Sequence, residues 1–465
     1  MPSTAHRKWW LVLIALAAGV ALRLWFIHAY PEIEGDPLVY GDIAKNWMLH
    51  GIYGRTIDGH IVPTLIRLPG YPLFLILCFR LFGLEHYNAV MYAQVAMDLG
   101  TCLLIADLAR RIWSSRAGWC ALWLAVLCPF TANYTATPLT ETLELFTIAL
   151  AFYAFERLLA SPRWLWAFTL AFAWSYAAIL RPDGALLAVA LCPALIFYGS
   201  KRWGAPAMIR WALVCAFISI LPFIPWTIRN ARTFHVFQPL APRYAVDPGE
   251  PTDPGFQRWT RTICVDFACT WEIYWNADND VIDLANLPTR SYDSHQQHIE
   301  TRALIDDYNR HTTITPEIDA RFAAFAAQRI HDHPFRYYVK LPIARLGDMI
   351  LRPRTEMLWI ELRWWQYRRH HAETVFAFGY AALNLAYFIA ALIGFFRRPP
   401  LRGAILTFIL LRCALLLTLE APEQRYTLEF FPPLIALAAI ALSGKQQPDT
   451  TPSKQSASLA DSLTR

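Results

Sequence analysis

A short polar stretch near the start of the chain combines acids with one arginine. Glu34, Asp36 and Asp42 lie in its first part, and Arg67 lies near its end, just ahead of a Pro-Gly-Tyr-Pro turn. A carboxylate in a partly dry pocket can have a raised pKa and act as a base. A guanidinium binds phosphate through two parallel hydrogen bonds. We therefore expect Asp36 to be a catalytic base and Arg67 to bind a phosphate group.

Plainer interpretations of the same residues stay open. Acids outside a membrane are often simply solvated, and an arginine beside apolar residues can extend its charged end toward water. Glu34 and Asp36 could also hold a divalent cation, but two acids are too few to specify one. His331 and His333 resemble metal ligands only weakly, because a spacing of two residues puts them on different faces of a helix.

Further charged residues stand at the ends of long apolar segments, namely Glu141, Arg181, Arg229 and Arg425. Each alone is explained by local structure, since an acid in the first turn of a helix interacts well with the helix dipole and arginines often anchor helix ends. Three arginines on one face nevertheless need an anionic partner, so we expect them to bind the same phosphate as Arg67. The residues expected to support the site are Glu34, Tyr40, Asp42, Tyr71 and Glu141.

The elements that must position these side chains are membrane helices. The chain has 465 residues, of which 56% are hydrophobic and 17% charged, whereas a soluble domain has about 45–50% apolar and about 25% charged residues. A membrane span needs roughly 20 apolar residues. The expected spans cover residues 9–29, 88–110, 116–131, 139–160, 164–181, 184–199, 207–228, 374–396, 402–420 and 426–443.

Basic residues follow every second span, which predicts the orientation of the chain. Cytoplasmic loops of membrane proteins carry the excess of Lys and Arg, so both termini are expected in the cytoplasm and the segments 30–87 and 229–373 outside. Counting Tyr71–Gly83 as a further span would reverse this order, so we expect an interfacial or re-entrant helix there. The basic clusters are Arg110, Arg111 and Arg116, then Arg157 and Arg163, then Lys201, Arg202 and Arg210, then Arg397, Arg398 and Arg402, and finally Lys445.

The expected fold is an all-α polytopic membrane protein of about ten transmembrane helices, with interfacial helices in the first outer loop. The outer segment is expected to be mostly helical, with helices near 296–309 and 317–332 and a surface-lying stretch at 334–352. The expected divisions are a transmembrane catalytic module at 1–235, the outer segment at 236–373, the last spans at 374–443 and a disordered cytoplasmic tail at 444–465.

Two further pairs of residues test this arrangement. Cys264 and Cys269 are the two cysteines in a polar region and could form a disulfide in an oxidising compartment. Arg23 and Arg412 lie within apolar spans, where an arginine costs roughly 2.5–3.5 kcal/mol on insertion scales. Arg23 is expected to extend outward to water, and Arg412 to have a carboxylate partner.

The order and sidedness of these motifs resemble the lipid-sugar-dependent membrane glycosyltransferases of the GT-C superfamily. The resemblance is to the protein-mannosyltransferase and aminoarabinose-transferase branch (glycosyltransferase family 39) and its RgtA/B/C/D-like domain. It covers residues 5–235 and, more loosely, the last three spans. The motifs that carry it are Asp36-x-x-x-Tyr40, Arg67-x-Pro-Gly-Tyr-Pro72, Glu141-Thr-Leu, Arg181-Pro, Pro225-Trp-x-x-Arg-Asn230 and Arg425-Tyr426.

The resemblance implies a polyprenyl- or dolichyl-phosphate sugar donor, with the catalytic acid of the family at Asp36 and its phosphate-binding cation, often lysine, at Arg67. It leaves a divalent cation open. We accordingly expect sugar transfer at the outer face of the inner or plasma membrane, with inversion at the sugar carbon. The acceptor is a glycan, a lipid or a protein, and no nucleic acid is involved. A transporter or flippase of lipid-linked sugars and a non-catalytic scaffold are the alternatives.

Overall fold

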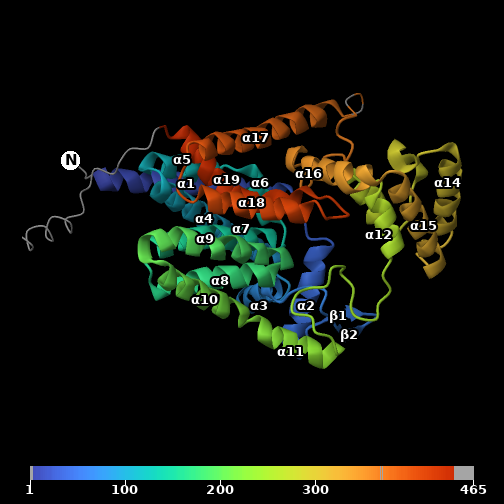
Figure 1. Ribbon diagram of the computed structural model, residues 1–465, viewed down its shortest axis with the longest axis horizontal. Coiled ribbons are helices and arrows are strands. Elements are labelled where there is room, and N and C mark those ends of the chain that lie inside the picture. Colours follow the sequence, from blue (N-terminus) through green and yellow to red (C-terminus); the bar gives the residue numbers. More distant parts are fainter. Residues whose placement is uncertain (1–3, 367, 369, 445–465) are drawn as a thin grey trace, which may run out of the picture.

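The computed structural model describes residues 4–366, 368 and 370–444. The long helices run side by side along the longest axis of the molecule, and the helices of the outer segment gather at one end of it (Figure 1). The start of α1 (Thr4–Ala29) and the end of α19 (Phe431–Leu442) lie at the opposite end. At that end Gly444 O accepts hydrogen bonds from Trp113 Nε1 and from Arg397, close to two of the basic clusters. The start of α1 and the end of α19 thus lie at the same end of the molecule, and Gly444 after α19 contacts Trp113 and Arg397.

The first outer loop contains two helices joined by a small hairpin. The hairpin turns at Asp58 and Gly59, which both have positive φ values of 49° and 78°, as a two-residue hairpin turn requires. In Figure 1, α2 lies across the direction of the long helices. The elements of this loop are α2 (Asp36–His50), β1 (Gly54–Ile57), β2 (His60–Pro63) and α3 (Gly70–Phe82).

The bundle that follows has a core of small and aromatic side chains. Small residues allow the close helix packing that holds membrane helices together without a hydrophobic driving force. At Gly199, for example, an added Cβ would lie 2.3 Å from Met208 Sδ of the next helix. Its elements are α4 (Tyr87–Ile112), α5 (Ser115–Val126), α6 (Pro129–Ala132), η1 (Asn133–Ala136), α7 (Glu141–Ala160), α8 (Trp164–Leu180), η2 (Pro182–Gly184), α9 (Ala185–Trp203), α10 (Ala205–Ile220) and α11 (Phe223–Phe234).

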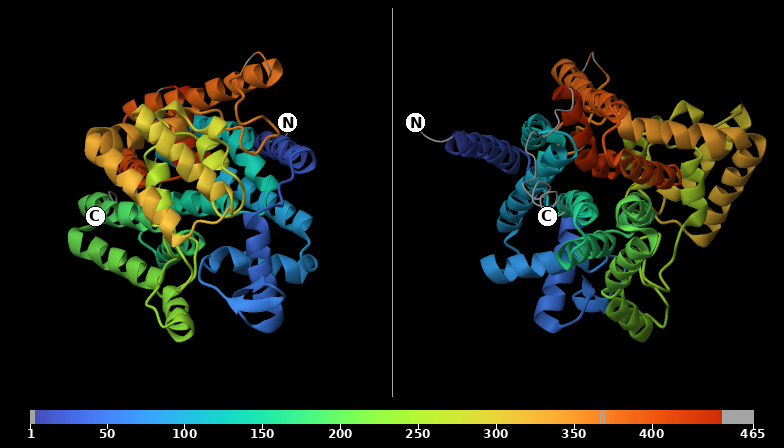
Figure 2. Two further views of the ribbon diagram at one scale, coloured as in Figure 1. Left: turned by 90° about the vertical axis from the view of Figure 1, so that its right-hand side faces the viewer. Right: turned by 60° about the vertical axis from the view of Figure 1, so that its left-hand side comes forward.

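The outer segment has an apolar core of its own, in which Trp259 and Phe322 are fully buried. Seen from that end, its helices cover the end of the bundle (Figure 2). Its elements are α12 (Pro254–Arg261), α13 (Phe267–Cys269), η3 (Thr270–Tyr274), η4 (Leu284–Asn286), η5 (Thr289–Ser291), α14 (His295–Asn309), α15 (Pro316–Asp332), η6 (Arg336–Lys340) and α16 (Leu341–Leu351).

The chain returns to the bundle through α17 (His371–Phe396), α18 (Arg402–Leu416), η7 (Gln424–Phe430) and α19. The last helix is not peripheral, because α19 packs against α4, α5 and α17. Its residues Leu434 to Ile440 are all buried. The short helix η7 therefore enters the centre of the molecule from its outer end.

The helices of the structure bear on the predicted spans and on the helices predicted outside the membrane. Among the described residues, six helices are long and apolar enough to cross a membrane, at Trp9–Ala29, Tyr87–Ile112, Pro182–Trp203, Ala205–Phe234, His371–Phe396 and Gln424–Leu442. The other four expected spans fall on helices that are shorter or more polar, so the number ten stays a prediction. The apolar helix Gly70–Phe82 is present, as are the two helices expected in the outer segment. The predicted tail lies outside the described residues apart from Gly444.

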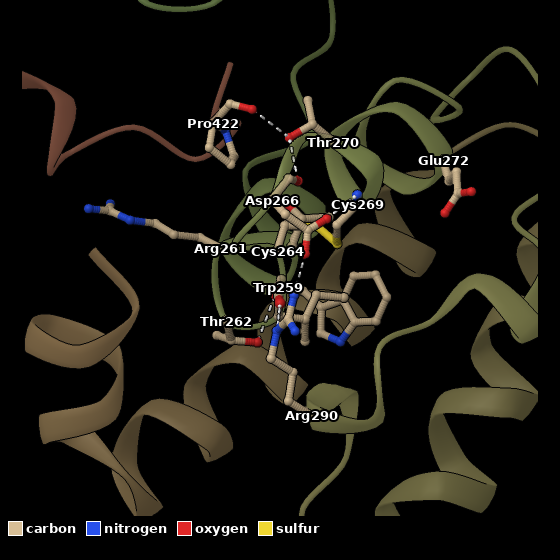
Figure 3. The surroundings of a disulfide bond; sticks show 12 residues. Trp259, Arg261, Thr262, Cys264, Asp266, Cys269, Thr270, Glu272, Arg290 and Pro422 are labelled. Carbon is tan, nitrogen blue, oxygen red and sulfur yellow. Dashed lines mark hydrogen bonds and ion pairs between the residues drawn. A yellow bond between two sulfur atoms is a disulfide. The ribbon is translucent and has the colours of Figure 1, made fainter. Parts of the chain in front are cut away.

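Cys264 and Cys269 are joined by a disulfide, with their Cα atoms 5.3 Å apart (Figure 3). The prediction for Arg23 was wrong. Its side chain does not extend to water but is fully buried, and it pairs with Asp98 at 2.5 Å. An opposite charge from the neighbouring helix compensates the guanidinium there, as burial of an ion requires. The partner predicted for Arg412 is present in the form of two carboxylates, described below.

Candidate active site

Asp36 is the first residue of α2, and the local sequence explains why the helix begins there. Gly35 has a φ of 63°, a backbone conformation that glycine adopts at little cost, and Pro37 occupies the first turn of the helix. An acid at this end of a helix is favoured by the helix dipole. The sequence thus turns the chain sharply and presents one carboxylate at the start of a rigid element.

Two arginines from opposite ends of the chain hold the Asp36 carboxylate. Arg67 Nη2 donates to Asp36 Oδ1 at 2.6 Å, and Arg425 Nη1 donates to Asp36 Oδ2 at 3.5 Å. The three side chains are partly open to solvent, with 32% of Asp36 and 22% of each arginine exposed. An anion that enters can therefore reach both guanidinium groups. We call Asp36, Arg67 and Arg425 the Asp36 cluster.

The charge state of Asp36 follows from this geometry. Burial alone would raise the pKa of Asp36, but Arg67 and then Arg425 outweigh burial, and the pKa lies below its ordinary value. The sequence-based expectation of a raised pKa is therefore wrong for the protein without a ligand. The expectation omitted the two cations that contact this carboxylate.

Arg67 is fixed in place from several sides. Its guanidinium lies over the ring of Tyr40 at 5.6 Å, and Tyr40 packs edge-on against Tyr71 with 5.1 Å between ring centroids. The hydroxyl of Tyr53 donates to the backbone carbonyl of Arg67 at 2.9 Å. Burial raises the pKa of Tyr40 to about 12, so its hydroxyl keeps its proton at neutral pH.

The segment before Arg67 is anchored by the outer segment. Asp247 accepts hydrogen bonds from Leu65 N and Thr64 Oγ1, both at 2.7 Å. Arg55 Nη2 also contacts Asp247, at 3.1 Å. The outer segment therefore holds the strand that leads to Arg67, and it is structurally coupled to the Asp36 cluster.

Arg425 is positioned by its own neighbour, Glu423. Arg425 Nε forms an ion pair with Glu423 Oε2 at 2.6 Å, and the hydroxyl of Tyr426 donates to Glu423 Oε1. Burial raises the pKa of Glu423, and the ion pair with Arg425 opposes this only in part. Glu423 thus fixes the direction of Arg425 and leaves Arg425 Nη1 for Asp36.

A second charged cluster lies beside the first, around Arg181 and Arg412. Arg181 pairs with Glu141 and Asp183, both at 3.2 Å. Arg412 pairs with Asp183 and Glu429, both at 3.0 Å. Arg181 also lies over the ring of Tyr426 at 5.3 Å, which connects the two clusters. Acids thus neutralise Arg181 and Arg412 in this structure, and the phosphate-binding role expected of Arg181 stays a prediction.

The remaining predicted residues are not brought to Asp36. Arg229 donates to the carbonyls of Tyr53 and Thr64, at 2.6 Å and 2.7 Å, and so supports the hairpin. Asp42 accepts from Thr56 N at 2.6 Å, which fixes the hairpin to α2. Glu34 contributes to the raised pKa of Glu32, for which burial is the larger cause. These three residues shape the loop around the site.

The sequence-based reasoning missed Glu356, which lies beside the site. The hydroxyl of Tyr134 donates to Glu356 Oε1 at 3.0 Å, and Glu356 Oε2 is buried with no hydrogen-bond partner. Burial raises the pKa of Glu356 even though Arg354 acts in the opposite direction. One signal was present, since the Arg-Pro-Arg-Thr-Glu run from Arg352 is a polar insertion between two apolar helices.

Nothing in the described part of the chain forms a group of three or more His, Cys, Asp or Glu side chains arranged to hold a metal ion. His331 is exposed and contacts the neighbouring Asp332 at 3.1 Å. Both oxygens of Asp36 point to arginines. The possible divalent cation at Glu34 and Asp36 stays a prediction.

Known proteins resemble this chain over part or most of its length. Residues 64–226 match the family model described as dolichyl-phosphate-mannose-protein mannosyltransferase. A search of the curated proteins found no match. Among solved structures, the chain is similar to ArnT from Cupriavidus metallidurans in the apo state, at 15% identity and a TM-score of 0.41, over 95% of this chain and 78% of that chain. It is also similar to the same protein bound to undecaprenyl phosphate, at 13% identity and a TM-score of 0.42, over 93% and 77% of the two chains.

The matched family range ends at Trp226 and includes four of the predicted site residues, Arg67, Tyr71, Glu141 and Arg181. Asp36 and Arg425 lie outside it. Over residues 64–226 the match confirms the resemblance expected from the sequence, and the chain is there similar to the membrane mannosyltransferases of the GT-C type.

Proposed function

We propose that the protein is a membrane glycosyltransferase that moves a sugar from a polyprenyl-phosphate donor to a hydroxyl or amine of an acceptor at the outer face of the membrane. The observation that carries this proposal is the Asp36 cluster, in which one carboxylate lies between two partly exposed arginines. A base and a phosphate-binding pair in contact are the groups that this transfer needs. The match to the mannosyltransferase family model over residues 64–226 supports it.

In the proposed reaction the donor phosphate binds to Arg67 and Arg425, which neutralise its charge and make it a good leaving group. The acceptor oxygen or nitrogen attacks the sugar carbon that carries the phosphate. The bond from that carbon to the phosphate oxygen breaks, and its electron pair leaves with the phosphate. The acceptor proton passes to Asp36. A single displacement of this kind inverts the configuration at the sugar carbon.

The ion pairs of Asp36 make its basicity dependent on the donor. In the protein without a ligand, both arginines stabilise the charged carboxylate and keep its pKa low. A bound phosphate contributes negative charge to the same guanidinium groups, and the compensation that Asp36 receives becomes smaller. Because a nearby negative charge raises the pKa of a carboxylate, Asp36 becomes a stronger base when the donor is in place. In the empty site, the low pKa of Asp36 keeps its carboxylate charged and so limits proton uptake before the donor binds.

The test is transfer by the purified protein in nanodiscs, supplied with a set of labelled polyprenyl-phosphate sugars and a membrane extract as the source of acceptor. We expect acceptor-dependent release of free polyprenyl phosphate, and we expect Asp36→Asn to abolish it while the protein still inserts and elutes as a single species. Near-normal release by that variant would rule out Asp36 as the base. Donor movement across the membrane without release would instead support a transporter.

A further inference from the structure

A third group of charges, separate from the two described above, lies where the outer segment meets the segment that leads to Arg425. Arg243 and Arg261 both pair with the same oxygen, Glu420 Oε1, and the distance from Arg261 Nη1 is 3.5 Å. Arg345 lies against them, because Arg345 Nη1 donates to the backbone carbonyl of Arg261 at 2.9 Å. We call these three arginines and Glu420 the Glu420 cluster.

Arg345 gives this cluster an unbalanced positive charge. Its side chain is fully buried, it has no ion pair among those of the described residues, and its Nε and Nη2 atoms have no hydrogen-bond partner. Burial and then the charge of Arg261 lower the pKa of Arg345 to about 10, which still leaves it charged at neutral pH. Backbone carbonyls of Arg261 and Cys264 accept hydrogen bonds from Arg345 Nη1, but a buried cation without an acidic partner is costly in any fold. Within the Glu420 cluster, the single carboxylate of Glu420 therefore compensates the charge of three guanidinium groups.

Arg243 and Arg261 are restrained by aromatic rings and stay accessible to a ligand. Arg243 lies over the ring of Tyr244 at 5.4 Å, and Arg261 lies over the ring of Tyr337 at 5.6 Å. Cation–π attraction restrains the position of each guanidinium group. More than half of the Arg243 side chain and about a quarter of the Arg261 side chain are exposed, at 61% and 23%. Figure 3 shows Arg261 extending away from the disulfide, on the side of Pro422.

This cluster is connected to the Asp36 cluster by a short piece of chain. Glu420 is three residues before Glu423, the residue that fixes Arg425. Between them, Pro422 O accepts a hydrogen bond from Thr270 Oγ1 of the outer segment at 3.3 Å (Figure 3). Tyr274 lies within electrostatic reach of both Glu420 and Glu423. A ligand bound at Glu420 would thus sit next to the proposed transfer site.

We propose that the Glu420 cluster binds an oxyanion, a phosphate or carboxylate group carried by the acceptor, and that Glu420 occupies the place of this group until the acceptor arrives. The assignment to the acceptor rests on the proposed function, whereas the oxyanion site itself does not. Guanidinium groups in this arrangement bind either kind of oxyanion. The acceptor anion would exchange places with Glu420 on Arg243 and Arg261.

The test uses the full chain in phosphatidylcholine nanodiscs, with inorganic phosphate as the probe at constant ionic strength and binding followed by the ³¹P linewidth of the phosphate. We expect Arg261→Gln to weaken binding at this site about tenfold, the ratio for one charge-assisted hydrogen bond. Glu420→Gln removes the internal competitor and should tighten binding severalfold. Arg310→Gln is the matched control, because Arg310 is an exposed arginine of the same segment with one acidic partner, Asp307 at 2.7 Å.

The outcomes separate this proposal from the previous one. Arg67→Gln should remove phosphate binding at the Asp36 cluster and leave the effect of Arg261→Gln unchanged. If Arg67→Gln changes nothing while Arg261→Gln weakens binding, the proposed function fails and the oxyanion site stands. If Arg261→Gln behaves like Arg310→Gln and Glu420→Gln does not tighten binding, the oxyanion site is refuted. Arg243→Gln carries the same expectation and replaces Arg261→Gln if that variant does not fold.

The source of the oxyanion is tested in the same system. Nanodiscs that contain phosphatidic acid should compete with inorganic phosphate if a lipid headgroup reaches the cluster. Absence of competition, with the effect of Arg261→Gln retained, identifies an oxyanion that arrives from the aqueous side. Both results support a site at the Glu420 cluster, because both require Arg261.

Discussion

Replacement of Asp36 by Asn should change donor binding and sugar transfer in opposite directions. In the protein without a ligand the carboxylate occupies Arg67 at 2.6 Å and Arg425 at 3.5 Å, so a donor phosphate must compete with it. The Asn side chain has nearly the same shape but no charge. Arg67 and Arg425 then lack their internal anion and are more available to phosphate, while the proton of the acceptor has no base to receive it.

The structure sets the size of both effects. A charge-assisted hydrogen bond contributes about 1.5–3 kcal/mol, but the three side chains here are 22–32% exposed, which screens the pairs toward the range of surface ion pairs. A release of about 1 kcal/mol corresponds to roughly fivefold tighter binding of polyprenyl phosphate. Loss of a general base lowers the rate by about 10²–10⁴. The variant should therefore bind its product more tightly and turn over at least a hundredfold more slowly.

The change in affinity is measured by microscale thermophoresis, with a short-chain polyprenyl phosphate and detergent-purified protein. The change in rate is measured by single-turnover transfer. Glu85→Gln is the control for the loss of one outer-face acid, because Glu85 is exposed and pairs with Lys45 at 3.0 Å, away from the arginines. If Asp36→Asn weakens polyprenyl phosphate binding, the carboxylate does not compete for the arginines. The reasoning about a donor-dependent base would then be wrong.

Three further predictions concern other groups. In Arg67→Gln the acid limb of the pH profile of kcat/KM should move to higher pH, because Arg67 favours the charged form of Asp36 and its loss raises the pKa of that carboxylate; an unmoved limb would contradict this. Arg412→Met should lower the thermal midpoint by the equivalent of about 3–5 kcal/mol, since the buried Glu429 loses its nearer cation and Asp183 keeps only Arg181. Replacement of the half-buried Arg402 by Met should cause little change. Cys264→Ser should cost about 2 kcal/mol for the short loop that the disulfide closes. Because four of the free thiols are buried, alkylation is done on denatured wild type without reductant, and it should label seven of the nine cysteines.

The convergence of distant residues at the site was largely predictable from the sequence. Asp36, Arg67 and Arg425 are far apart in the chain, but alternation of basic loops assigns the ends of the spans to two faces. All three fell on the same face, and in the structure they touch. The acidic partners of Arg412 were expected for a similar reason, because the cost of an isolated charge in an apolar helix demands compensation.

The exact pairing of charges was not predictable. Which acid neutralises which arginine depends on the rotation of each helix about its axis, and the sequence does not fix that rotation. Arg229 satisfies backbone carbonyls that have no signature in the sequence. Asp98, which pairs with Arg23, lies in an apolar helix about 75 residues away and was not considered. The hairpin is different, because Asp58-Gly59 between two short segments rich in β-branched residues, 56–57 and 61–62, is a strong hairpin signal in the sequence.

The position of Arg425 has a consequence for how the protein is made. Arg425 contacts Asp36 across 389 positions of the sequence, and it precedes the last helix. During synthesis the chain emerges from its beginning, so the first loop is made long before Arg425. Until α19 inserts against α4 and α5, Asp36 has one cation instead of two and the phosphate site is half built. If the proposed function holds, a nascent or truncated chain in the membrane could not consume the lipid-linked donor, and activity would begin only when insertion is complete.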